Sequence, residues 1–421
     1  MVKSRLYITF ISLLTCLLIS AAHVDTMTGM FSDKVRTLRL MTNGNPQNIP
    51  VIFQGTADRI EISFDILSDS RDYLRYRLIH CNAYWQPDGL VDSEFLDGFN
   101  EGTIEDYDFS RATTVHYVHY RLELPNAETV PLISGNYLVQ VYDETDPDNV
   151  LLQARFMVCE NNASISAAVS SRTDVDYNDA HQQLSIAVDT ERAPVRDPFN
   201  DLIVLVQQNG RLDSEVALRH PLRTQGSQVI YEHLPALIFP AGNQYRRMET
   251  VSVRYLPMGI ENIEYQAPYY HFDVAQDGPR AASQYLYDSD QHGAFLIREY
   301  DSSDSDLEAD YVVVHFKLDY LAAPDDMIFL DGDFTSRRFD SGSRMIYNPG
   351  TGLWEKALLL KQGAYNYQYL VVPSGGRWGL TAPVEGDHYQ TANRYTIKVY
   401  SRNPAERYDR LIGISVIESG I

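Results

Sequence analysis

The segment DSEFLDGFNEGTIEDYDFSRATTVHYVHYRLELP, from Asp92 to Pro125, is the most telling part of this 421-residue chain. Its second half alternates between two faces, and one face carries His116, Val118, Tyr120, Leu122 and Leu124. This period of two predicts a β-strand over 114–124 that stops at the proline. The first half is polar, aromatic and interrupted by glycine, which indicates a surface loop joined to the strand. Such loops often carry binding residues.

The same alternation extends along most of the chain and predicts an all-β fold. Short strands separated by turns favour two or three tandem immunoglobulin-like β-sandwich domains. The 29 tyrosines fit this class, because tyrosine suits half-buried strands. The predicted divisions are an N-terminal β-sandwich domain over 23–160, a middle β domain over 161–280, an acidic linker or loop over 281–310 and a C-terminal domain over 311–421.

Strands of the C-terminal domain are expected at 312–318 and 327–331, with a hairpin of 354–360 and 364–372 across Lys361-Gln-Gly363. A further strand is expected around Tyr395 to Val399. The order of Phe329-Leu-Asp-Gly-Asp-Phe334, Trp354 and Tyr365-Asn-Tyr-Gln-Tyr369 resembles the immunoglobulin-like early-set domains that include glycogen-binding modules.

Residues 1–22 have the features of a secretory signal peptide. Lys3 and Arg5 precede an apolar run over 6–19, and Ser20-Ala-Ala22 provides small residues for cleavage. The alternative is a membrane anchor, but the run is shorter than the roughly 20 residues that a bilayer-spanning helix needs. The mature chain is therefore expected in the periplasm, with no membrane span.

The formal net charge of −22 argues against nucleic acid and anionic lipid surfaces as partners. Acidity alone identifies no partner, because it also keeps a protein soluble. Cys81 and Cys159 remain after the predicted cleavage. A disulfide between them and two free buried thiols both stay open, since the bridge requires neighbouring strands.

Several segments together resemble the type IX secretion system plug protein family of Bacteroidetes. They lie in the same order along nearly the whole mature chain. They are FLDGFNE at 95–101, HYVHYR at 116–121, SGNYLVQVY at 134–142, RFMV at 155–158, QQNGR at 207–211 and LLLKQGAYNYQY at 358–369.

This resemblance implies a non-enzymatic periplasmic plug. Its partner would be the giant outer-membrane β-barrel translocon protein, whose periplasmic opening it would bind and seal when no cargo is present. It would be peripherally associated with the outer membrane through that translocon. A barrel of many strands encloses an aqueous lumen that side chains cannot fill, so a folded body is needed to close it. The resemblance assigns no contact residues.

The chain shows no pattern that demands catalysis, a cofactor, a metal or a small-molecule substrate. His116 and His119 are three residues apart, which on a strand places them on opposite faces. No G-x-S-x-G or phosphate-binding loop occurs. The acidic run Asp301–Asp310 lacks the glycine and final glutamate of the calcium loop, and is expected to be a solvated linker.

Phe95 and Phe99 are the candidate partner-binding residues. Either the loop buries both rings beneath itself, or one ring anchors a partner protein, since aromatic anchors dominate interface energetics. The alternative function is a cell-envelope carbohydrate-binding protein that uses the C-terminal domain. Trp378, in the loop Gly375-Gly-Arg-Trp-Gly379, is the ring expected to be exposed, whereas Trp354 is expected in the core.

Overall fold

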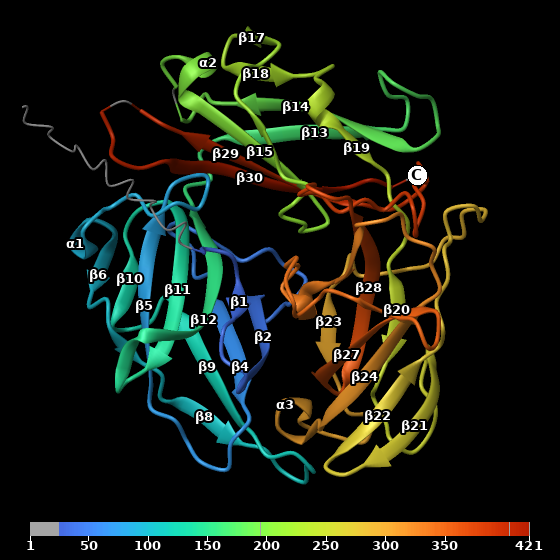
Figure 1. Cartoon of the computed structure of the whole chain (residues 1–421). Helices are drawn as coiled ribbons and strands as arrows, with labels where there is room; N and C mark the ends of the chain where they lie inside the picture. The colour runs from blue at the N-terminus through green and yellow to red at the C-terminus, as the bar shows by residue number, and fades with distance from the viewer. Residues whose placement is uncertain (1–24, 194, 404, 421) are drawn as a thin grey trace, which may run out of the picture.

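The computed structural model describes residues 25–193, 195–403 and 405–420, so the expected signal peptide lies outside the described residues. The chain is almost entirely β, which confirms the prediction of an all-β fold. Its sheets form three sandwiches that lie around a common centre (Figure 1). We call them the N-terminal sandwich (strands within 29–159), the middle sandwich (strands within 164–240 and 394–418) and the inserted sandwich (strands within 246–372).

The N-terminal sandwich packs two sheets over one core. The first sheet has the order β1 (Gly29–Met30), β12 (Asp146–Cys159), β11 (Gly135–Asp143), β5 (Leu74–Cys81) and β7 (Gly102–Thr103), with β3 (Val51–Phe53) parallel to β12. The second has the order β2 (Val35–Thr42), β4 (Ile60–Ile66), β9 (Val118–Leu124) and β8 (Asp106–Phe109). Helix α1 (Asp92–Phe95) leads into a ribbon of β6 (Leu96–Gly98) and β10 (Thr129–Pro131).

Alternation explains why these segments form half-buried strands. Strand β5 places Leu74, Tyr76 and Leu78 in the core and turns Arg75 and Arg77 outward. The strand predicted over 114–124 begins only at Val118. His116 lies outside it and pairs with Asp69, whereas His119 is buried in β9.

Cys81 and Cys159 are buried free thiols. Strand β11 lies between the two strands that carry them, and Cys159 is two residues beyond the position of β12 in register with Cys81, so their Cα atoms are separated by more than two strand spacings, or more than about 9.5 Å. This exceeds the reach of a disulfide. Burial raises the pKa of each thiol to about 12, which leaves both unreactive at neutral pH.

The middle sandwich is closed by the last strands of the chain. One sheet has the order β13 (Ser164–Ser170), β14 (His181–Asp189), β18 (Gln228–Tyr231) and β17 (Arg223–Gln225), with β19 (Ile238–Pro240) also on β14. The other has the order β16 (Val216–Leu218), β15 (Leu202–Gln208), β29 (Arg394–Ser401) and β30 (Arg410–Glu418). The short helices α2 (Pro198–Asp201) and η1 (Pro235–Leu237) join its strands.

The prediction of one C-terminal domain over 311–421 does not hold for β29 and β30. Strand β29 pairs with β15 from Leu202↔Ser401 to Gln208↔Tyr395. The apolar face of β29 packs into the same core as β15, and not with the strands before residue 372. Alternation predicted this strand and its buried face, but alternation carries no information on which sheet accepts the strand.

The inserted sandwich also has two sheets. One holds β20 (Arg246–Glu249), β28 (Gly363–Val372), β23 (Phe295–Ile297) and β25 (Met327–Asp331). The other has the order β21 (Ile260–Gln266), β22 (Tyr269–Val274), β24 (Tyr311–Leu318), β27 (Leu353–Lys361) and β26 (Ile346–Asn348). Helices α3 (Ser305–Glu308) and η2 (Asp333–Thr335) lie between strands.

The predicted hairpin of 354–360 with 364–372 is wrong, because β27 and β28 lie in different sheets. The chain crosses from one sheet to the other at Gln362. The side chain of Gln362 is buried and donates to the backbone oxygen of Thr250, 3.1 Å away. The single residue between the two strands therefore forms a corner between the sheets.

The acidic run over 301–310 is a docking segment rather than a solvated linker. Asp304 accepts from Arg111 and Asp306 accepts from Arg39, both at 2.7 Å. Asp310 accepts from the backbone nitrogens of residues 114 and 115 at 2.8 and 3.0 Å. Composition alone missed this, because the compensating donors come from the N-terminal sandwich, between 193 and 267 positions earlier.

Candidate functional site

The two candidate phenylalanines, at the end of α1 and just after β6, differ in exposure. Phe95 is 2% exposed and packs against the rings of His80 and Tyr137, with centroids 5.8 and 6.0 Å away. Phe99 is 80% exposed. The structure therefore separates the candidate pair into one core ring and one surface ring.

The backbone on both sides of Phe99 is held firmly although its ring is in solvent. Its nitrogen donates to the oxygen of Glu128 at 3.1 Å, and its oxygen accepts from Thr129 at 3.1 Å. Gly98 has a φ of +103°, and a Cβ there would lie 1.9 Å from the oxygen of Glu128. Only glycine fits this close approach. Asn100 then bonds both the nitrogen and the oxygen of Leu78, at 2.7 and 2.9 Å.

The exposed ring has apolar neighbours on the same ribbon. Val130, opposite Asp97, is 38% exposed, and Leu132, two residues further, is 49% exposed. Alternation places Val130 and Leu132 on the same exposed side along β10, and Phe99 is exposed directly after β6. We call these three residues the ribbon tip; the ribbon that carries them lies at the outer edge of the N-terminal sandwich (Figure 1).

His80 and His119 form structural hydrogen bonds in the N-terminal sandwich, although Nε2 of His119 is buried without a partner among the described residues. His80 bonds Asp88 at 2.5 Å and the oxygen of Ser134 at 3.2 Å, and it is buried. His119 bonds Asp65 at 2.6 Å. Within residues 25–193, 195–403 and 405–420, no group of three or more histidines, cysteines and acids is arranged to hold a metal ion.

Asp65 is the centre of a buried polar contact between the N-terminal and inserted sandwiches. Lys361 and Tyr311 each donate to its Oδ2 at 2.6 Å, and His119 bonds its Oδ1. Burial alone would raise the pKa of Asp65, but the charge of Lys361 and the hydrogen bond of His119 bring it below its usual value. The ammonium of Lys361 also lies 4.0 Å from the ring centroid of Tyr117.

The middle sandwich is attached by two further contacts. An apolar cluster joins it to the N-terminal sandwich, with Trp85 and Met157 on one side and Leu205, Tyr400 and Leu411 on the other. Toward the inserted sandwich, the buried Arg211 donates to the oxygen of Gly379 at 2.6 Å, while Asp213 accepts from the nitrogen of Gly379 at 2.9 Å. These contacts hold each sandwich to both others.

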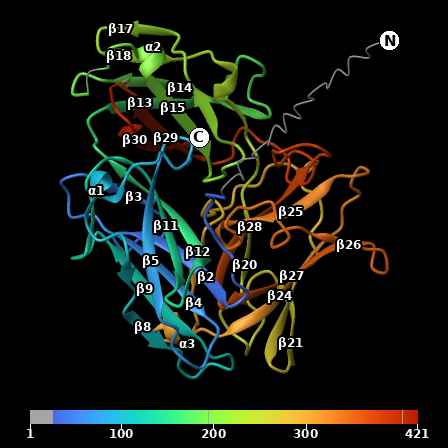
Figure 2. The ribbon, with the colours of Figure 1, turned by 60° about the vertical axis from the view of Figure 1, so that its left-hand side comes forward.

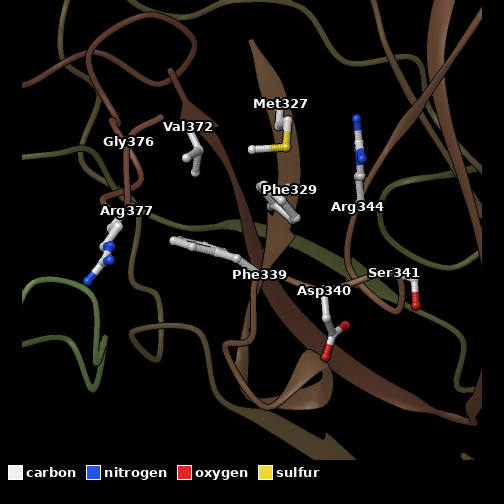
Figure 3. A pocket seen from close by; sticks show the side chains of 9 residues that line it. All are labelled: Met327, Phe329, Phe339, Asp340, Ser341, Arg344, Val372, Gly376 and Arg377. Carbon is white, nitrogen blue, oxygen red and sulfur yellow. The ribbon is translucent and has the colours of Figure 1, made fainter. Parts of the chain in front are cut away.

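A hollow of about 440 Å³ opens on the inserted sandwich. Figure 3 shows its apolar floor, formed by Met327, Phe329, Phe339 and Val372, with two arginines at its sides. Phe329 and Phe339 pack with centroids 4.9 Å apart at 33°, and Phe329 is 4% exposed. The floor is therefore a packed core edge and not an open aromatic platform.

The two tryptophans of the carbohydrate hypothesis also differ in exposure. Trp378 is 71% exposed, as expected, but it does not line the hollow. Trp354 packs against the core of the inserted sandwich and donates to the oxygen of Tyr320 at 3.0 Å. The exposed apolar surface at this loop therefore consists of one indole, with Leu380 beside it at 41% exposure.

The part of the chain that the structure describes contains no helix that is both long and apolar enough to cross a membrane.

Comparison with known proteins points to one family. A family model for the first domain of type 9 secretion system plug proteins matches residues 35–160. The crystal structure of a hypothetical protein from Parabacteroides merdae ATCC 43184 is 42% identical, with a TM-score of 0.93, and the similarity covers 94% of this chain and 100% of that chain. No curated protein matches.

An alkylpurine DNA glycosylase from Pseudomonas fluorescens, solved with DNA, is 14% identical over 30% of each chain. Its TM-score of 0.17 supports no argument about fold or function.

The molecule is thus an all-β protein of three interlocked sandwiches that presents a fixed aromatic ring on a surface ribbon. It belongs to the family of type IX secretion system plug proteins, and the family match contains the ribbon tip and Asp65. Membership makes it a component of a secretion apparatus of the cell envelope.

Proposed function

We propose that this protein is a periplasmic plug that binds the periplasmic opening of the large outer-membrane translocon barrel and seals it when no cargo is present. The observation that carries the proposal is the mutual attachment of the three sandwiches. A body that closes a wide aqueous lumen must resist deformation, and each sandwich here is fixed to both others. No reactive group is required for this task.

The buried contact of Asp65 with Lys361 supports a single rigid body. Both side chains are almost completely buried, at 0% and 1% exposure. Breaking a buried ion pair by removing one partner costs about 3–5 kcal/mol, because the other charge is left unpaired. Hinge motion between the N-terminal and inserted sandwiches would have to separate these charges. The junction therefore favours one fixed arrangement.

The ribbon tip is the proposed contact with the barrel. Phe99 is a large ring on a backbone that is already ordered, so little conformational entropy is lost when a partner covers it. Aromatic residues of this kind form the energetic centres of interfaces. Val130 and Leu132 extend the apolar surface around the ring.

A capture experiment tests this proposal. Tagged wild-type chain, purified from solubilised envelopes of its own host, should retain one very large outer-membrane barrel protein. Phe99→Asp should reduce the retained barrel at least about tenfold, since it removes an anchor ring and places a charge in the contact. Phe109, on β8, is 48% exposed and provides the matched control. Phe109→Asp should retain the barrel as wild type does, and equal retention by both variants would refute the ribbon tip as the contact.

A glycan-binding role remains the second candidate, supported by the exposure of Trp378. It requires that the chain is retarded in gels that contain envelope glycans and that Trp378→Ala abolishes the retardation. Retardation of this kind, together with failure to capture a barrel, would replace the plug proposal.

A further inference from the structure

A cleft of about 290 Å³ lies where the three sandwiches meet. The N-terminal sandwich contributes β2, β12 and the segment over 46–50 to its wall. The middle sandwich contributes β29 and the turn after β15, and the inserted sandwich contributes β23 and the segment after η2. Figure 1 shows β2 and β23 on the two sides of the centre of the molecule with β29 above them, and Figure 2 shows β2, β12 and β29 from another direction. We call this space the junction cleft.

The charge of the junction cleft is opposite to that of the chain. The whole chain has 57 acidic and 35 basic residues, yet one acid, Asp333, lines the cleft. The basic residues come from all three sandwiches. They are Arg39, Arg155, Arg337, Arg394 and Lys398.

Four of these five cations have a carboxylate partner. Asp306, Glu418 and Glu215 pair with Arg39, Arg394 and Lys398 and lie outside the lining. Arg337 pairs with Asp331 and Asp333. The four pairs hold the basic side chains in place while their carboxylates, apart from Asp333, stay out of the cleft wall.

Arg155 differs from the other four, because no described carboxylate lies within ion-pair distance of it. Its Nε donates to the oxygen of Thr26 at 2.6 Å and its Nη2 to the hydroxyl of Thr26 at 3.2 Å. The guanidinium also lies 4.5 Å from the ring centroid of Trp85. Together with the two hydrogen bonds, this contact holds the side chain in one position. Burial lowers the pKa of Arg155 to about 10, so the side chain is still charged at neutral pH.

The same wall contains buried nitrogens that lack a hydrogen-bond partner among the described residues. They are Nε of Arg39, Nε1 of Trp85 and Nδ1 of His292. Trp85 is 6% exposed and the side chain of Arg39 is 10% exposed. A buried polar atom without a partner costs about 1–3 kcal/mol, so each of these nitrogens favours a water, an ion or a ligand group beside it.

About half of the other lining residues are apolar, and the rest are amide and hydroxyl side chains such as Gln207 and Thr396. Leu38, Leu40, Met157 and Phe295 line the cleft from two sandwiches, and Leu212 lines it from the third. Cations within an apolar wall match a ligand that carries one negative group on an apolar body. A small hydrophilic anion would leave the apolar surface without contacts.

We propose that the junction cleft binds a carboxylate carried on an apolar body, with Arg155 as its ion partner. The proposal is independent of the plug function. Such a ligand would contact all three sandwiches at once and would stabilise their attachment, because binding to the folded state adds to its stability. Two sources supply this chemistry, namely a fatty acid and the C-terminus of a polypeptide that ends in apolar residues.

The proposal is tested by calorimetric titration of the full mature chain with two probes. The probes are octanoate and N-acetyl-Leu-Leu, whose C-terminal carboxylate is free. At least one of the two should bind with a dissociation constant below about 1 mM and raise the melting temperature. Octanamide, which lacks the charge, and acetate, which lacks the apolar body, should bind at least about tenfold more weakly. Binding by octanoate alone indicates a lipid-like ligand, and binding by the peptide alone indicates a polypeptide C-terminus.

Two variants locate the site. Arg155→Gln should weaken the binding probe at least about tenfold, the loss expected when one charge-assisted hydrogen bond is removed. Leu212→Glu places a negative charge in the cleft wall and should weaken binding to a similar degree, which decides the question if Arg155→Gln fails to fold. Arg344→Gln, at an exposed arginine of the other hollow, is the matched control and should bind as wild type. Absence of binding by both probes, or equal affinity in Leu212→Glu and wild type, would overturn the proposal.

Discussion

The N-terminal sandwich is joined to its two neighbours by junctions of opposite chemistry. Toward the middle sandwich the centre is apolar, with Trp85 against Leu205 and Tyr400. Toward the inserted sandwich the centre is ionic, with Asp65 against Lys361. An apolar junction tolerates small shifts, because dispersion and burial have little directionality. An ionic junction has a strict geometry, because each charge must keep its partner. We infer that the ionic junction fixes the angle between the N-terminal and inserted sandwiches. The apolar junction holds the N-terminal and middle sandwiches together through buried apolar area.

The largest effect is expected at the ionic junction. Lys361→Met leaves the buried carboxylate of Asp65 without its ammonium partner, and we expect a loss of about 3–5 kcal/mol in the free energy of unfolding. The measurement is denaturant unfolding at neutral pH. Adding Asp65→Asn to Lys361→Met removes the unpaired charge, so the double variant should be more stable than Lys361→Met. Strict additivity of the two single losses would contradict an ionic origin.

A substitution in the apolar junction should lower the free energy of unfolding by a comparable or smaller amount. Leu205 is 1% exposed, and Leu205→Ala should cost about 2–5 kcal/mol through lost burial and the cavity left behind. Unlike the loss at Lys361, this loss should be the same at pH 4 and pH 7, since no titrating group is involved. A strong pH dependence of the Leu205→Ala effect would remove the distinction between the two junctions.

The next largest effect is expected from acid, which should lower the free energy of unfolding through His292. His292 lines the junction cleft, and its burial, together with the charges of Arg394 and Arg337, lowers its pKa to about 4 although Glu418 acts in the opposite direction. The unfolded state, with a pKa near 6.5, therefore binds the proton first as pH falls. Stability from this histidine is complete above pH 6.5 and is lost as pH falls from 6.5 toward 4, by roughly 2–4 kcal/mol in total.

Unfolding free energies of wild type and His292→Gln, measured between pH 4 and pH 7, check this expectation. The glutamine variant should show a flatter profile over that window. Identical profiles would mean that folding leaves the pKa of His292 unchanged, which would contradict its burial as the cause of a lowered pKa.

The smallest effect on stability is expected at the ribbon tip. Phe99→Ala should change the free energy of unfolding by less than about 0.5 kcal/mol, because the ring is 80% exposed. Phe95→Ala, four residues earlier, should cost about 3–5 kcal/mol, because that ring is in the core. Thermal melting of both variants gives the comparison. A large loss in Phe99→Ala would mean that the ring is structural and no contact surface.

The sequence predicted the positions of the strands far better than it predicted which strands pair in a sheet. The strand expected over 327–331 is β25, and the strand expected at 312–318 lies within β24. Periodicity specifies a strand and its buried face, because side chains alternate along it. It does not specify the sheet, so the position of β29 beside β15 and the corner at Gln362 could not be foreseen.

The candidate site was predicted in part. The loop after residue 92 and its two rings were identified, but the choice between Phe95 and Phe99 depends on the close approach of Gly98 to Glu128, which no local pattern encodes. The ionic junction was missed because Asp65 and Lys361 are 296 positions apart. A lysine in an otherwise apolar strand end was the one available signal. The junction cleft was missed for the same reason, since its wall comes from three separate parts of the chain.

The most direct test of the proposal that this protein is a rigid plug is a measurement of leakage across the outer membrane. Host cells that lack this chain but keep the translocon barrel should admit a periplasm-excluded dye, and expression of the wild-type chain should restore exclusion. Unchanged exclusion in the deleted strain, with the barrel present at its normal level, would contradict the account of this protein as a rigid plug.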